Sequence, residues 1–170
     1  MFKESVFKEK VAEAYKQIQD SICAGLEIAD GKGLFVEELW EREGGGGGRT
    51  RVIQHGNVIE KGGVNFSAVY GKLPDAVKKA FKVENDEFFA TGVSIVLHPE
   101  NPFVPIIHMN IRYFEMDEQT RWFGGGIDLT PHYVIPTDVR FFHYHLKQAC
   151  DEFKAEFYPK FKALADDYFF

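Results

Sequence analysis

The first part of the chain places its apolar residues at helical spacing. Apolar side chains recur every three or four positions from Val11 to Leu26, so they form one stripe on a helix predicted over residues 5–29. Gly31 and Gly33 then favour the end of the helix. Most such stripes pack on a core, so this helix should lie on a sheet. The stripe consists of Val11, Tyr15, Ile18, Ile22 and Leu26.

A run of five glycines, Gly44 to Gly48, precedes a hairpin predicted over residues 51–60 with its turn at His55-Gly56-Asn57. Glycine leaves the backbone free, so the run predicts a flexible flap on which Arg49 and Arg51 meet acidic groups of a substrate. A plain linker is the alternative. A phosphate cradle fits poorly, because a P-loop continues with Lys and then Ser or Thr, whereas an arginine follows here.

Period-two alternation predicts the strands. One runs from Val64 to Tyr70, and three more cover residues 89–98, 106–114 and 122–130. In these last three, the odd-numbered positions are mostly apolar, so the even-numbered side chains share the opposite face. A short helical or turn segment is expected to open at Leu73-Pro74-Asp75 and to end near Phe81, and helices are expected over about residues 137–157 and 159–170. The whole pattern predicts an α+β fold with helices around a mostly antiparallel sheet.

Length and composition fit a folded chain. Its 170 residues, 45% of them hydrophobic, suit a single domain over residues 1–170. The last residues, Asp167 to Phe170, carry no cap or polar tail, so we expect this domain to be truncated at its C-terminus.

Charge and cysteine content narrow the class of protein. The formal net charge of −6 argues against nucleic acid or an anionic membrane as partner. Cys23 and Cys150 form no CxxC motif, which favours a reducing compartment. No segment reaches the ~20 apolar residues that a membrane span needs, and the first residues do not read as a signal peptide. We therefore expect a cytoplasmic protein.

The even-numbered strand positions carry the candidate chemistry. If the three later strands are neighbours with matched orientation, their polar side chains line one cleft. A solvated sheet face is the alternative, since one such face is normal in antiparallel sheets. Glycines inside a strand favour a ligand, because they usually mark the close approach of another group. The positions are Ser94, His98, His108, Asn110, Arg112 and Asp128, with Gly124 and Gly126 as an open floor.

Histidines add proton-transfer or metal-binding capacity. His98, His108, His143 and His145 show no HExxH spacing, and a single histidine on a partly apolar face is more often a structural residue. An unperturbed pKa of ~6.5 suits histidine to proton transfer near neutral pH or to holding a divalent metal. The residues themselves leave both roles open.

Five motifs, in this order, resemble the amino-terminal portion of the oxygen-dependent coproporphyrinogen III oxidases. No single motif suffices, but their joint order is specific and spans nearly the whole chain. They are Glu38–Glu43 followed by Gly44–Gly48 and Arg49–Val52, Gly62–Ser67, Gly92–Ser94 through His98-Pro99, Asn101-Pro102 through His108, and Trp122–Pro131.

The resemblance implies a large, flat antiparallel sheet with helices on both faces, a homodimer, and conversion of coproporphyrinogen III to protoporphyrinogen IX by molecular oxygen in haem biosynthesis. It implies no organic cofactor. Substrate contacts are then expected at Ser94, Asn110, Ile111 and Arg112, and a proton donor at His108. Some members hold a divalent metal through histidines. His98, His108 and His143 match those positions, so a divalent metal is admitted as a cofactor, whereas His145 does not match.

Together, the residues and the resemblance give a mechanistic hypothesis. Asp128 orients a pyrrole N–H, Arg112 anchors the propionate that leaves as carbon dioxide, and Gly124 and Gly126 make room for the macrocycle. Family members continue well beyond Phe170. The alternative is therefore an impaired fragment that binds a tetrapyrrole or a partner without turnover.

Overall fold

The computed structural model describes residues 6–81, 84 and 86–169. The chain divides into two compact units, Met1–His132 and Tyr133–Phe170, and each is described by itself.

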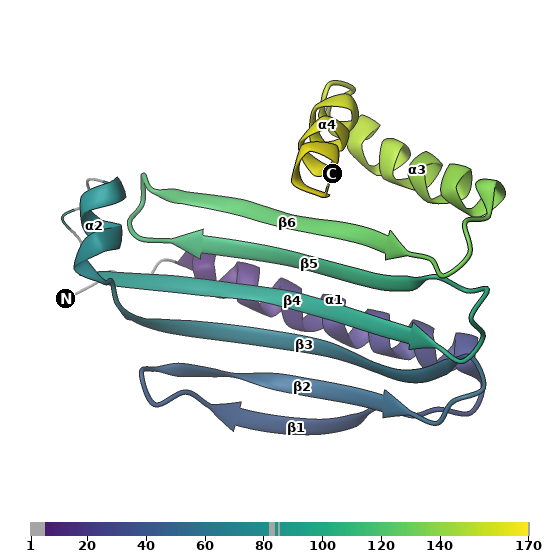
Figure 1. The fold of residues 1–170 in the computed structure, drawn as a ribbon. Coiled ribbons are helices and arrows are strands. Elements are labelled where there is room, and N and C mark those ends of the chain that lie inside the picture. The colour runs from purple at the N-terminus through teal and green to yellow at the C-terminus, as the bar shows by residue number, and fades with distance from the viewer. Residues whose placement is uncertain (1–5, 82–83, 85, 170) are drawn as a thin grey trace. The chain divides into compact units, whose positions relative to one another are not determined.

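The first unit is built on one six-stranded antiparallel sheet whose strands follow one another in the order β1-β2-β3-β4-β5-β6 (Figure 1). The predicted α+β class and antiparallel sheet are thereby confirmed; a helical layer on the second face stays a prediction. The elements of this unit are α1 (Val6–Asp30), β1 (Val36–Glu41), β2 (Gly46–Gln54), β3 (Ile59–Lys72), α2 (Asp75–Phe81), β4 (Glu87–Pro99), β5 (Ile106–Glu115) and β6 (Arg121–Thr130).

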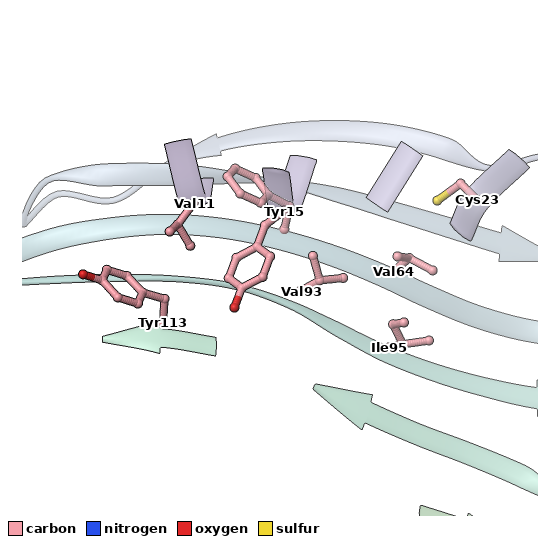
Figure 2. Packing of buried hydrophobic residues seen from close by; sticks show 8 residues of the cluster. Val11, Tyr15, Cys23, Val64, Val93, Ile95 and Tyr113 are labelled. Carbon is pink, nitrogen blue, oxygen red and sulfur yellow. The ribbon is translucent and has the colours of Figure 1, made fainter. Parts of the chain in front are cut away.

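Helix α1 lies across one face of the sheet and closes the core. The predicted stripe faces β3 and β4, with Val11 and Tyr15 buried and the other three members partly buried against the same cluster. Figure 2 shows residues of α1 facing apolar side chains of β3, β4 and β5. The buried cluster consists of Val11, Tyr15, Cys23, Val64, Phe66, Val93, Ile95 and Tyr113.

One polar residue of α1 enters this core, which the apolar stripe did not predict. Gln19 is 0% exposed. Its amide nitrogen donates hydrogen bonds to the carbonyl oxygens of Arg49 (2.8 Å) and Val64 (2.7 Å), and its oxygen accepts one from Arg49 Nε (2.7 Å). Both the nitrogen and the oxygen of the buried amide therefore have hydrogen-bond partners, which connect the helix to β2 and β3.

The end of α1 is fixed by the carboxylate of Asp30. It accepts hydrogen bonds from the backbone N–H groups of Gly33 (2.6 Å), of Asn57 and Val58 in the β2–β3 turn, and of Ile59 at the start of β3 (2.8–3.0 Å). These bonds, that from Ile59 foremost, lower the pKa of Asp30 well below its usual value. They join the helix end to the hairpin that the sequence predicted.

The predicted glycine flap is wrong. Gly46, Gly47 and Gly48 belong to β2 and pair with β3, and Gly47 and Gly48 also pair with β1. A side chain at Gly48 would begin 2.4 Å from the ring of Trp40, and the backbone of Gly45 turns with a φ of +112°. The glycines thus permit a tight hairpin and a tryptophan lying on the strand, rather than movement.

The second unit consists of α3 (Pro136–Asp151) and α4 (Phe157–Phe169). Pro136 begins α3, a position where its missing N–H costs nothing. Two helices were predicted near the end of the chain and both are present, but the first ends at Asp151 rather than near residue 157, where α4 begins. Within the part of the chain that the structure describes, none of the helices has the length and apolar character to cross a membrane.

Candidate functional site

The predicted site residues of β4, β5 and β6 lie together on the face of the sheet opposite helix α1. These strands are direct neighbours, and residues opposite one another in an antiparallel pair point to the same side. The adjacency and matched orientation assumed from the sequence are confirmed. Three rows result: Gly92–Arg112–Gly124, Ser94–Asn110–Gly126 and Val96–His108–Asp128.

The last of these rows contains an acid–base pair. His108 Nδ1 lies 2.9 Å from Asp128 Oδ1, and the Thr130 hydroxyl donates to the same oxygen at 3.2 Å. A carboxylate only accepts hydrogen bonds, so the proton between the two atoms is carried by His108 Nδ1. His108 Nε2 takes no part in this hydrogen bond and can interact with a ligand. The side chains are 41% and 29% exposed, which keeps the pair accessible. Among the described residues, no hydrogen bond reaches Asp128 Oδ2.

Two glycines of β6 leave the space beside this pair open. A Cβ built on Gly126 meets no atom within 4 Å, and one on Gly124 meets only Trp122 Cδ1 at 4.0 Å. Neither residue has a positive φ. Local packing and backbone conformation therefore do not require glycine at either position, which is consistent with a ligand lying over β6.

Arg112 and Ser94 are exposed on this face. Within the described ranges, no carboxylate lies at ion-pair distance from Arg112. Ile111, between Asn110 and Arg112, points the other way and packs against the core, so only its backbone is available to a ligand on the second face.

Arg49 and Arg51 do not join this group, which corrects the expectation that they extend over the substrate. They lie on the α1 face, opposite Phe66 and Val64 in β3. Arg49 pairs with Asp20 at 2.7 Å, and Arg51 pairs with Asp20 at 2.7 Å and Glu37 at 2.8 Å. Burial opposes the charge of Arg51, but hydrogen bonds to Glu37, Cys23 and Asp20 raise its pKa overall. The acidic groups that these arginines meet belong to the protein itself.

The three candidate metal ligands belong to different elements. His98 and His108 are on β4 and β5, whereas His143 lies on α3 in the second unit, where its Nδ1 is buried without a hydrogen-bond partner. Among the described residues, no group of three or more His, Cys, Asp or Glu side chains could hold a metal ion. The described residues thus form no metal centre, and the divalent metal stays a prediction.

Two further features of this face were missed at the sequence level. Lys61 and Asn65 of β3 lie opposite His98 and Ser94, and the alternation of β3 already contained that signal. Farther along, the rings of Phe88, Phe114, Trp122 and Phe81 stack in a line, with successive centroids 4.9–5.7 Å apart. This line joins β4, β5, β6 and α2, and it is formed by the strand register together with the packing of Phe81 of α2 on Trp122.

The sheet of this α+β protein is covered by helix α1 on one face. Its other face carries the acid–base pair, the Arg112 guanidinium and two glycines with open space above them, so it can bind an anionic ligand. The chain belongs to the coproporphyrinogen III oxidase family, whose model matches residues 10–170.

Curated relatives agree with this assignment. The chain is 50% identical over 179 residues to the oxygen-dependent coproporphyrinogen-III oxidase, chloroplastic, of Glycine max, covering 96% of this chain and 46% of that protein. It is 49% identical to coproporphyrinogen-III oxidase 1, chloroplastic, of Arabidopsis thaliana, covering 89% and 43%. It is also 49% identical to the oxygen-dependent enzyme of Prochlorococcus marinus strain MIT 9312, covering 96% and 48%. The chain thus spans about half the length of these relatives.

Proposed function

We propose that this chain carries the substrate-binding sheet and the acid–base pair of an oxygen-dependent coproporphyrinogen III oxidase. The observation that supports this most is the gathering of Ser94, Asn110, Arg112, His108 and Asp128 on one face of three adjacent strands, beside two glycines with open space above them. Family membership supplies the substrate, which carries four propionates and needs a broad, partly cationic surface.

The reaction removes one propionate at a time. Each –CH2–CH2–COOH arm loses carbon dioxide, two electrons and two protons, and becomes –CH=CH2. Dioxygen takes up the two electrons and two protons and becomes hydrogen peroxide. Two such steps convert coproporphyrinogen III to protoporphyrinogen IX, so the organic product retains two propionates.

The roles of the side chains follow from their positions. Asp128 Oδ2 accepts a pyrrole N–H and raises the electron density of that ring, which favours transfer of electrons to dioxygen. His108, held through Nδ1 by Asp128, presents its unprotonated Nε2 to take up a proton that the substrate releases, and then delivers that proton to the reduced oxygen. Arg112 forks onto the carboxylate of the reacting propionate and fixes its arm beside the pair. Ser94 and Asn110 offer hydrogen bonds between these two points.

The proposal extends to assembly and location. A homodimer is what the resemblance implies. A cytoplasmic location is supported by the two cysteines, which are both free thiols, Cys23 buried and Cys150 half-buried. The two plant relatives are named chloroplastic, and the Prochlorococcus relative carries no such label.

The test uses the purified 170-residue chain with coproporphyrinogen III in air. Release of carbon dioxide, together with porphyrin fluorescence of the product after oxidation, supports the proposal. Binding without release of carbon dioxide supports instead a chain that holds the tetrapyrrole without turnover. Absence of binding contradicts both.

A further inference from the structure

A second positive region lies on the site face, away from Arg112. Lys61 of β3 and His98 of β4 are directly opposite one another in the sheet. Gly63 and Val96 form the next row along, and that row continues through His108 to Asp128. Lys61 and His98 therefore point to the same side of the sheet as the acid–base pair.

The register fixes how these groups are spaced. Arg112 is four residues from His108 along β5, or about 13 Å, in one direction. The row of Lys61 and His98 is two residues from the row of His108 in the other direction, or about 7 Å. Lys61 is also three strands away from Asp128, about 14 Å across the sheet. The acid–base pair thus lies between two positive regions.

The cationic side chains on the two faces of the sheet differ in whether a carboxylate of the protein neutralises them. On the α1 face, Asp20 and Glu37 neutralise Arg49 and Arg51. On the site face, no carboxylate of the described residues is within ion-pair distance of Lys61 or Arg112. A ligand with carboxylates on opposite sides would complement these two cations, and a tetrapyrrole with a propionate on each of its four rings has that arrangement.

We propose that Lys61 and His98 form a second carboxylate subsite, which binds a propionate other than the one held by Arg112; this rests on the proposed function. Lys61 supplies the positive charge that attracts the carboxylate. His98, on the neighbouring strand, supplies a hydrogen bond to the same carboxylate. By holding a remote propionate, the subsite sets the rotation of the macrocycle over the sheet. It thereby selects which propionate reaches Arg112 and the acid–base pair.

The experiment measures binding of coproporphyrin III, the stable oxidised form of the substrate, by fluorescence titration of the 170-residue chain at low ionic strength. Lys61→Met removes the charge and keeps the length of the side chain, and we expect about a tenfold loss of affinity. Lys61→Arg should restore binding. The control is Lys72→Met, which removes the same charge from the same strand on the α1 face and should leave affinity unchanged.

A second probe separates charge from shape. The tetramethyl ester of coproporphyrin III has the same macrocycle and no carboxylates, so Lys61→Met should bind it as wild type does. If wild type binds coproporphyrin III and Lys61→Met binds it equally well, the subsite is disproved while the proposed function stands. If wild type does not bind coproporphyrin III at all, the proposed function and the subsite fail together.

Discussion

The buried amide of Gln19 offers the sharpest test of how helix α1 holds the sheet. Replacing Gln19 with Met keeps the volume of the side chain but removes all three of its hydrogen bonds, to the Arg49 and Val64 carbonyls and from Arg49 Nε. The site face is untouched, because the amide lies on the opposite side of the sheet. Any effect should therefore appear in stability before it appears in binding.

The size of the effect follows from the three hydrogen bonds that the methionine cannot make. Two neutral hydrogen bonds contribute about 1 kcal/mol each and the bond from the guanidinium about 1.5–3 kcal/mol, while the more apolar methionine offsets part of the loss. We expect Gln19→Met to lower the free energy of unfolding by about 3 kcal/mol. For a chain of this size that corresponds to a fall in Tm of about 10 °C.

Thermal and urea unfolding followed by circular dichroism give the measurement. Gln17→Met is the matched control, because Gln17 is exposed on the same helix and its amide donates a hydrogen bond to another exposed residue, Glu13, at 3.4 Å. Its unfolding free energy should stay within about 0.5 kcal/mol of wild type. Equal stability of the Gln19 and Gln17 variants would refute the assignment of Gln19 as a structural tie.

Three further predictions concern the site and its support. Asp128→Asn should lower the rate of carbon dioxide release at least about 100-fold with an unchanged circular dichroism spectrum, and near-normal turnover would remove Asp128 from the mechanism. Gly126→Val should fold normally, because its side chain enters open space, yet weaken coproporphyrin III binding more than about tenfold; unchanged affinity would place the ligand elsewhere. Asp30 has a lowered pKa in the folded chain, so its contribution to stability is present above its unfolded pKa of about 4 and is lost as the pH falls toward the folded value. Asp30→Asn should therefore be less stable than wild type at pH 7, with a difference in Tm that shrinks toward pH 3, and a difference that is constant with pH would contradict this.

Helix and strand periods were sufficient to predict most elements of the fold. The stripe from Val11 to Leu26 predicted α1 almost to its ends, because an apolar stripe at helical spacing can be buried only on a helix. The alternation in β4, β5 and β6 predicted which side chains share a face, because successive strand residues point to opposite sides. Even the candidate site face was therefore visible in the sequence.

Errors arose where a residue type suits more than one environment. A glycine run is compatible with a mobile flap and with a tightly packed strand, and the choice depended on Trp40, which lies against Gly48 from the neighbouring strand. Arginines beside glycines suit a substrate carboxylate, but Asp20 and Glu37 of α1 and β1 neutralise Arg49 and Arg51. These partners are distant in sequence, so no local pattern identifies them.

The sequence alone determined the two faces of the sheet, because a period of two needs nothing beyond the chain itself. Only the tertiary structure decided which residues stand opposite one another: the register places His108 beside Asp128 and Lys61 beside His98. Register depends on hydrogen bonds between strands, and a shift by one residue would move each side chain to the other face. The elements are thus determined locally, while the acid–base pair and its flanking cations arise from pairing between strands.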